Sequence, residues 1–288
     1  MDRVKRLIQA ERVYRQGYSG KNIRIAVLDT GVFLHRDIRS NVVYFKDFVG
    51  GRRLSYDDNG HGTHVAGIIA GNGKQKGIAP QAKLVVLKVL EKDGGGNTNR
   101  VLQALDWVLS NRERYQIRIL NFSIGFLPGS KGSEQKQIVE GLERLWDENV
   151  TVVTAAGNNG PGKGSITVPG ISRKVITVGA SDDTTGNVGL PKSYSGQGPT
   201  ECCVMKPEIL APGTDIVSLD HRGNHYVRKS GTSMAAPVVS GALALALQKN
   251  PHLRPEELKV KLYESAGRQE NGKSAWGILQ VDKLMDLI

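Results

Sequence analysis

Short apolar runs alternate along the chain with longer amphipathic stretches. The runs that predict strands span residues 23–28, 83–90, 117–122, 150–153 and 175–178. Such runs are typical of strands buried on both faces. Between them, apolar residues recur at helical spacing, as in the stretches containing Val101 and Leu105 or Ile138 and Leu142. Strands that alternate with helices indicate an α/β fold with a mostly parallel sheet covered on both faces.

The alternation runs from residue 23 to residue 248 without a linker-like gap. We therefore expect residues 1–288 to form a single domain. Within residues 1–20, Val4, Ile8 and Val13 follow helical spacing, which predicts a helical extension packed on that domain. Pro255 begins a last surface helix, because proline is favoured in the first helical turn.

Residues 238–247 form an apolar run rich in alanine and leucine, which predicts a buried helix. Ser233 lies where a polar turn becomes the start of that helix. Free backbone N–H groups and the helix dipole favour an anion there, so a serine nucleophile could use its own N–H to bind the oxyanion it forms. Alternatively, Ser233 or Thr232 merely caps the helix. Taken alone, this segment leaves both interpretations open.

Two other stretches carry candidate chemistry. Asp29 directly follows the apolar run 23–28, although a turn or capping aspartate is the simpler interpretation of this residue alone. His61 begins a predicted helix over residues 61–70 and is free to face a cleft. We expect His64, one turn later, to be packed or hydrogen-bonded. The two histidines lack an HExxH pattern and an acidic third ligand, so no metal site is predicted.

Strand ends and helix starts can meet at one edge of such a sheet. Asp29 and Asn158 follow predicted strands, while His61 and Ser233 begin predicted helices. These side chains are the types that acyl transfer needs. An imidazole takes the serine proton, a carboxylate orients the imidazole, and an amide with a backbone N–H binds the oxyanion.

Composition excludes several other classes of protein. The 288 residues are 39% apolar, which is enough for a sizeable core. The net charge is +11, but lysine and arginine are scattered, so we expect a solvated surface and no nucleic-acid partner. No apolar run is long enough for a membrane span. The N-terminus lacks the apolar region of a secretory signal, and the only cysteines, Cys202 and Cys203, are adjacent. We therefore expect a cytoplasmic protein.

Four segments together carry a resemblance to a known family. They are residues 26–31 (AVLDTG), 59–67 (NGHGTHVAG), 155–158 (AAGN) and 231–237 (GTSMAAP). In this order they resemble the signatures of the subtilases, the subtilisin-like serine peptidases. The start of the chain and residues 9–27 look most like the intracellular bacterial branch of that family. The similarity extends from about residue 15 to the end of the chain. It implies a three-layer α/β/α fold and a serine endopeptidase.

The resemblance also assigns roles to individual residues. It implies Ser233 as nucleophile, His61 as general base and acid, Asp29 as the residue that orients His61, and Asn158 as an oxyanion-hole donor. It also implies that residues 94–96 and 123–125 bind a polypeptide substrate between them as an added β-strand. Together with the pocket for the residue before the cut (P1), the implied substrate-binding residues are Gly94, Gly95, Gly96, Ser123, Ile124, Gly125, Ala156, Gly157 and Thr167.

Departures from the family pattern refine these expectations. No acidic residue lies within 159–171, so we expect an uncharged, mostly apolar P1 preference. Thr167 stands where many relatives keep glycine, which should make the P1 pocket shallower. Val101 and Ile124 could line the pocket further upstream or simply belong to the core. These expectations concern the shape of the site more than its chemistry.

The resemblance also bears on metal and on activity. Residues 71–77 form a short loop with two lysines, so the high-affinity calcium loop of many secreted relatives should be absent. Calcium sites built from carbonyl groups, for example near Pro169, stay open, and no cofactor is expected to be required. No folding prodomain is expected before Asp29. The rival interpretation is a catalytically silent peptide-binding protein on the same fold. Every triad residue type is present, which favours an active enzyme.

Overall fold

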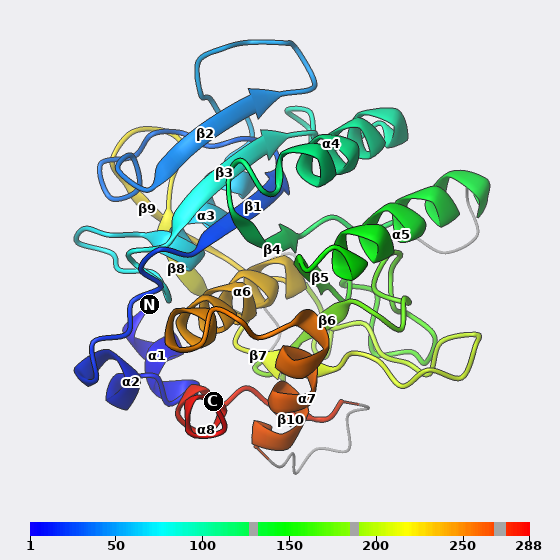
Figure 1. The fold of residues 1–288 in the computed structure, drawn as a ribbon. Coiled ribbons are helices and arrows are strands. Elements are labelled where there is room, and N and C mark those ends of the chain that lie inside the picture. The colour runs from blue at the N-terminus through cyan, green and yellow to red at the C-terminus, as the bar shows by residue number, and fades with distance from the viewer. Residues whose placement is uncertain (127–131, 185–189, 268–274) are drawn as a thin grey trace.

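The computed structural model describes residues 1–126, 132–184, 190–267 and 275–288 (Figure 1). Its main sheet has the strand order β10-β7-β6-β5-β4-β1-β3-β2, and all of its described pairings are parallel. The strands are β1 (Arg24–Asp29), β2 (Val42–Asp47), β3 (Lys83–Lys88), β4 (Ile117–Phe122), β5 (Thr151–Ala155), β6 (Ile176–Ala180), β7 (Ile209–Ala211) and β10 (Gly277–Ile278). The predicted α/β fold with a mostly parallel sheet is confirmed.

Burial explains why the central strands read as continuous apolar runs. Every residue of β5 and β6 is buried, and β1 and β3 are buried at all but their first residue. The edge strand β2 is buried only at Asp47. Strands covered on both faces cannot alternate apolar with polar residues, whereas an edge strand keeps polar positions in water.

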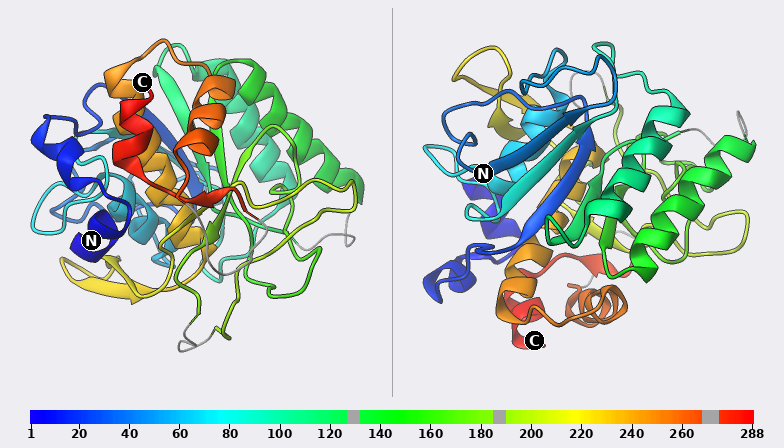
Figure 2. Two further views of the ribbon diagram at one scale, coloured as in Figure 1. Left: turned by 90° about the horizontal axis from the view of Figure 1, so that it is seen from below. Right: turned by 45° about the horizontal axis from the view of Figure 1, so that its top comes forward.

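Helices cover the two faces of the sheet, giving the expected three layers (Figures 1 and 2). On one face, α4 (Thr98–Asn111) packs against α5 (Gly132–Asp147). On the other, α3 (His61–Ala70) packs against α6 (Thr232–Lys249). Residues 234–247 of α6 are all buried, as the apolar run predicted. No helix within the described ranges has the length and apolar character needed to cross a membrane.

The N-terminal extension is helical, but it consists of two short helices. It forms α1 (Asp2–Leu7) and α2 (Glu11–Arg15), separated near Gln9, whose φ of 55° is incompatible with a continuous helix. The extension packs against α8 (Val281–Asp286), where Val281 N donates to Ile8 O over 2.8 Å. The remaining elements are β8 (Ile216–Leu219), β9 (Tyr226–Lys229) and α7 (Pro255–Ser265).

Candidate active site

The carboxyl edge of the sheet brings Asp29 and His61 together. Asp29 is the last residue of β1 and is fully buried. Its Oδ1 lies 2.7 Å from Nδ1 of His61, the first residue of α3. This approach depends on Gly62, because a Cβ there would lie 2.1 Å from Gly31 O and 3.1 Å from the Asp29 Cβ. The sequence GHG therefore lets the start of α3 sit directly against the end of β1.

The electrostatics of this pair raise the pKa of His61. The side chain is 25% exposed. Burial lowers its pKa, but the charge of Asp29 and the hydrogen bond that His61 donates to Asp29 outweigh burial, so the pKa lies above its ordinary value of 6.5. Lys229 opposes this rise. The imidazole can thus accept a proton readily and hold it beside a buried carboxylate.

Ser233 lies in the first turn of α6, where backbone N–H groups have no partner within the helix. Its Oγ donates to Ser123 O over 3.2 Å. In the described structure, no hydrogen bond joins Ser233 to His61. The Ser233 hydroxyl is instead engaged with Ser123 O, and catalytic hydrogen bonds are often absent or long until substrate binds.

A proline strengthens the link between Ser233 and the segment after β4. Pro237 has no N–H, so the carbonyl four residues earlier, Ser233 O, lacks an intrahelical donor. Ser123 Oγ donates to that carbonyl over 3.4 Å. Asn121 in turn donates to Ser123 Oγ over 2.9 Å and accepts from Ser240 Oγ at the same distance. These contacts join the segment that follows β4 to the start of α6.

Asn158 is held in a defined orientation by Thr232. The Asn158 Oδ1 accepts from Thr232 N over 3.0 Å and from Thr232 Oγ1 over 3.1 Å. Gly157 N donates to the same hydroxyl over 3.0 Å. Because the amide oxygen is engaged, the Nδ2 group is left to donate elsewhere. Sequence reasoning considered Thr232 only as a cap, although its position beside Ser233 was a signal of a further role.

The two segments expected to bind substrate differ in exposure. Gly94, Gly95 and Gly96 are exposed, while Ser123 and Ile124 are buried and Gly125 is exposed. Val101 is fully buried, which fits the core interpretation of that residue. The glycine segment 94–96 is therefore exposed along its whole length, whereas the segment 123–125 is exposed only at Gly125.

Thr167 fills the space between two glycines of the predicted P1 pocket. Its side chain is 4% exposed. A Cβ on Gly125 would lie 2.5 Å from Thr167 Oγ1, and one on Gly157 would lie 2.4 Å from Thr167 Cγ2. Thr167 N also donates to Ala156 O over 3.0 Å. The threonine thus takes up volume that a glycine at this position would leave open.

The chemistry around His64 and loop 71–77 bears on metal binding. His64 is fully buried with Nε2 3.0 Å from Ile216 O, as expected, and burial lowers its pKa to about 3. Near the loop, the Asp37 carboxylate accepts from Gln75 N and Tyr226 OH. The Asp37 carboxylate is thus engaged by donors within the protein. Among the described residues, no histidine, cysteine or acidic side chains cluster as a metal site.

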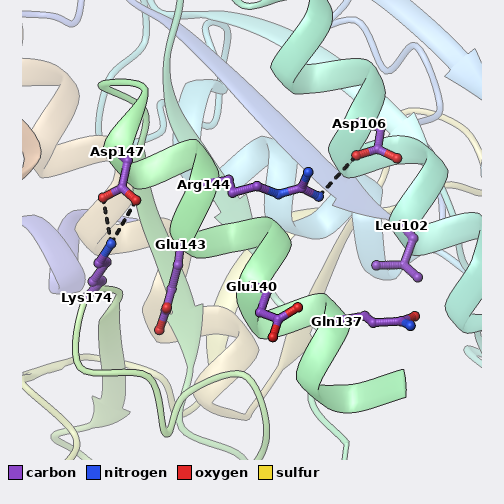
Figure 3. Close-up of a pocket in the computed structure, with 8 residues that line it drawn as sticks. All are labelled: Leu102, Asp106, Gln137, Glu140, Glu143, Arg144, Asp147 and Lys174. Carbon is purple, nitrogen blue, oxygen red and sulfur yellow. Dashed lines mark hydrogen bonds and ion pairs between the residues drawn. The ribbon is translucent and has the colours of Figure 1, made fainter. Parts of the chain in front are cut away.

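A separate surface hollow lies between α4 and α5 (Figure 3). Four of its charged side chains form ion pairs: Arg144 Nη2 lies 3.4 Å from Asp106 Oδ1, and Lys174 Nζ lies 2.6 Å from Asp147 Oδ1. No serine, threonine, cysteine or histidine is among its lining residues. We therefore place the reactive site at the strand ends.

Known proteins match this chain along most of its length. The family model of the subtilase family matches residues 20–278. The serine protease AprX of Bacillus subtilis (strain 168) is 37% identical, over 96% of this chain and 67% of that protein. Subtilisin DY of Bacillus licheniformis is 34% identical, over 90% of this chain and 89% of its own length.

Solved structures agree with the sequence comparisons. Sphericase superposes with a TM-score of 0.80 at 31% identity, covering 91% of this chain and 92% of its own. A cold adapted subtilisin-like serine proteinase superposes with a TM-score of 0.74, also at 31% identity, covering 92% of this chain and 90% of its own. Fold, family model and relatives therefore point the same way, and the chain belongs to the subtilase family and is a subtilisin-like serine endopeptidase.

Proposed function

We propose that this endopeptidase cleaves peptide bonds with Asp29, His61 and Ser233 as a catalytic triad. The observation that carries the proposal is the 2.7 Å contact between His61 Nδ1 and the fully buried Asp29. Because Nδ1 carries the proton that is bonded to the carboxylate, Nε2 is unprotonated and can act as the base. It takes the Ser233 Oγ proton as that oxygen attacks the substrate carbonyl. It then delivers this proton to the leaving amine, leaving an acyl-enzyme that water hydrolyses by the same steps.

Asn158 supplies a donor to the oxyanion in this proposal. Thr232 holds the amide oxygen, which directs Nδ2 away from that contact. The second donor is the backbone N–H of Ser233, in the first turn of α6. Donors fixed before reaction stabilise charge without reorganising, which is why such sites accelerate acyl transfer.

The substrate in this proposal is a polypeptide bound as an added strand between residues 94–96 and 123–125. Open glycine backbone on these segments supports main-chain recognition. For P1 we propose an uncharged, mostly apolar side chain of modest size, because Thr167 narrows the space between Gly125 and Gly157. Peptides with arginine at P1 should therefore be cleaved more slowly than matched peptides with leucine, methionine or phenylalanine.

Active-site labelling tests the proposed triad. Native protein and the Ser233→Ala variant are incubated with a phosphonylating serine-hydrolase reagent, and intact mass is measured. We expect one adduct on Ser233, none on the variant, and loss of casein cleavage in the variant. A folded native protein without an adduct would instead favour the alternative, a catalytically silent peptide-binding protein on this fold.

The setting of the enzyme is also a proposal. We propose that it needs no cofactor and no nucleic-acid or membrane partner. A cytoplasmic location is supported by Cys202 and Cys203, which are both exposed and unpaired as thiols. Fractionation of the native source, with detection of this chain by mass spectrometry, tests the location.

A further inference from the structure

A carboxylate that the proposed mechanism does not use lies next to the triad. Asp57 is 7% exposed and lies in the loop before α3. Its Oδ2 accepts from Thr63 N over 2.9 Å and from Thr63 Oγ1 over 2.6 Å. Its Oδ1 accepts from Gly60 N over 2.8 Å and from Asn59 N over 3.1 Å. Asp57 thus binds the first turn of the helix that carries His61.

The same carboxylate also reaches the residue after Asp29. Thr30 Oγ1 donates to Asp57 Oδ1 over 2.9 Å. That hydroxyl accepts in turn from Gly62 N over 2.9 Å. One buried hydrogen-bond network therefore joins the residue that follows Asp29 to the residue that follows His61. A shift of either element against the other would break at least one of these bonds.

The backbone carbonyl of Thr30 is held by Lys88, which is paired with Asp58. Lys88, the last residue of β3, is fully buried and lies beside Asp29 in the sheet register. Its Nζ donates to Thr30 O over 2.6 Å and to Asp58 Oδ1 over 2.7 Å. The hydroxyl and the carbonyl of Thr30 are therefore both fixed: the hydroxyl is bonded to Asp57, and the carbonyl is bonded to Lys88, which is paired with Asp58. Buried polar networks with each member engaged hold a rigid geometry.

We propose that Asp57 is a positioning residue, which holds the start of α3 against the end of β1 and thereby sets the Asp29–His61 hydrogen bond. The inference rests on the proposed role of His61 as general base. The hydrogen bonds that carry this role join Asp57 to Thr30 and Thr63, and they involve no ligand. Because misplacing a catalytic group by about 1 Å can lower rates about 100-fold, loss of this network should act mainly on kcat.

The charge of Asp57 adds a signature that a merely structural role would lack. Asp57 is among the groups that raise the pKa of His61, after the larger contribution of Asp29. Other charged or titratable groups near the imidazole include Lys229 on β9, which lowers this pKa, and His64 on α3. The ring of His221 lies against Gly60, the residue before His61. Removing the Asp57 charge therefore lowers the pKa of His61, and the acid limb of kcat/KM moves to lower pH.

The test measures kcat, KM and the pH profile of Asp57→Asn, with each preparation normalised by phosphonate titration of Ser233. We expect kcat to fall about 10- to 100-fold, KM for a short peptide to change less than about 3-fold, and the acid limb to move to lower pH. Asp147→Asn, a distant surface carboxylate paired with Lys174, is the control for a lost negative charge and should match the wild type.

A pair of milder variants keeps the proposal testable if Asp57→Asn fails to fold. Thr30→Val removes the hydroxyl that joins Asp57 to β1, whereas Thr30→Ser keeps it. We expect kcat to fall for Thr30→Val and to stay near wild type for Thr30→Ser. Equal kcat per titrated site in both Thr30 variants, or an unmoved acid limb in folded Asp57→Asn, would overturn the inference. Labelling of Ser233 in the wild type separately tests the proposed triad.

Discussion

Replacing Thr167 by glycine should deepen the P1 pocket and change which peptides the enzyme prefers. The threonine side chain stands between Gly125 and Gly157, within 2.5 Å of the points where their Cβ atoms would lie. Thr167→Gly removes three side-chain heavy atoms from this space. A large apolar P1 side chain can then bury about two or three more carbon atoms, whereas an alanine side chain is too short to use the added depth.

The magnitude follows from the burial of those carbons. At about 0.8 kcal/mol for each buried methylene, about 2 kcal/mol of extra transition-state binding is expected for phenylalanine at P1. That free energy corresponds to a rise of about 30-fold in the ratio of kcat/KM for phenylalanine over alanine. Pocket contacts of this size are within the range by which enzymes discriminate apolar side chains.

The assay compares matched chromogenic peptides that differ only at P1, with enzyme concentration set by active-site titration. Thr167→Val is the control, because it keeps the volume and removes the hydroxyl, and it should retain the wild-type ratio. A ratio within about 2-fold of wild type for fully titrating Thr167→Gly would refute the assignment of Thr167 to the P1 pocket.

Three further outcomes are expected. The acid limb of kcat/KM should have its midpoint above 6.5, because His61 must be neutral and its pKa is raised; Asp29→Asn should lower that midpoint along with kcat, and an unchanged midpoint would contradict the pairing. His64 has its pKa lowered from 6.5 to about 3, so its contribution to stability is complete above pH 6.5 and is lost as the pH falls toward 3, a loss on the order of 5 kcal/mol. This loss is measured by comparing the free energy of unfolding at several pH values for Ser233→Ala and for Ser233→Ala with His64→Gln. The variant with glutamine should lose less stability as the pH falls. Chelator should leave the melting temperature unchanged, since tightly bound calcium would otherwise contribute roughly 10 °C.

Sequence reasoning predicted the parts of the fold that have strong local periodicity. The helix expected over residues 61–70 is α3, and the strand expected over 117–122 is β4. The strands β2, β7, β8, β9 and β10 were missed. β2 lies at an edge and is half-exposed, while β7 has three residues and β10 two. Such short strands are defined by their pairing partners rather than by a pattern of their own.

The site was predicted in outline because its residue types and the sheet edge are readable from the chain. The hydrogen bonds within the site were not predicted, since they join residues that lie far apart in the sequence. Thr232 and Asn158 are 74 residues apart, and Asp57 and Thr30 are 27 apart. The orientation of the Ser233 hydroxyl toward Ser123 O likewise depends on packing between β4 and α6. Local sequence carries no signal for pairings of this kind.

The burial of α6 has a consequence for how the enzyme survives its own activity. Any unfolded copy of a peptidase is a substrate for the copies that remain folded. Ser233 begins a helix whose residues 234–247 are all buried, so this helix opens only with the bulk of the structure. A molecule whose core has opened therefore no longer presents an ordered nucleophile. During heat inactivation, amide exchange in α6 should track the loss of activity, and self-digestion should be second order in protein because folded copies cleave unfolded ones.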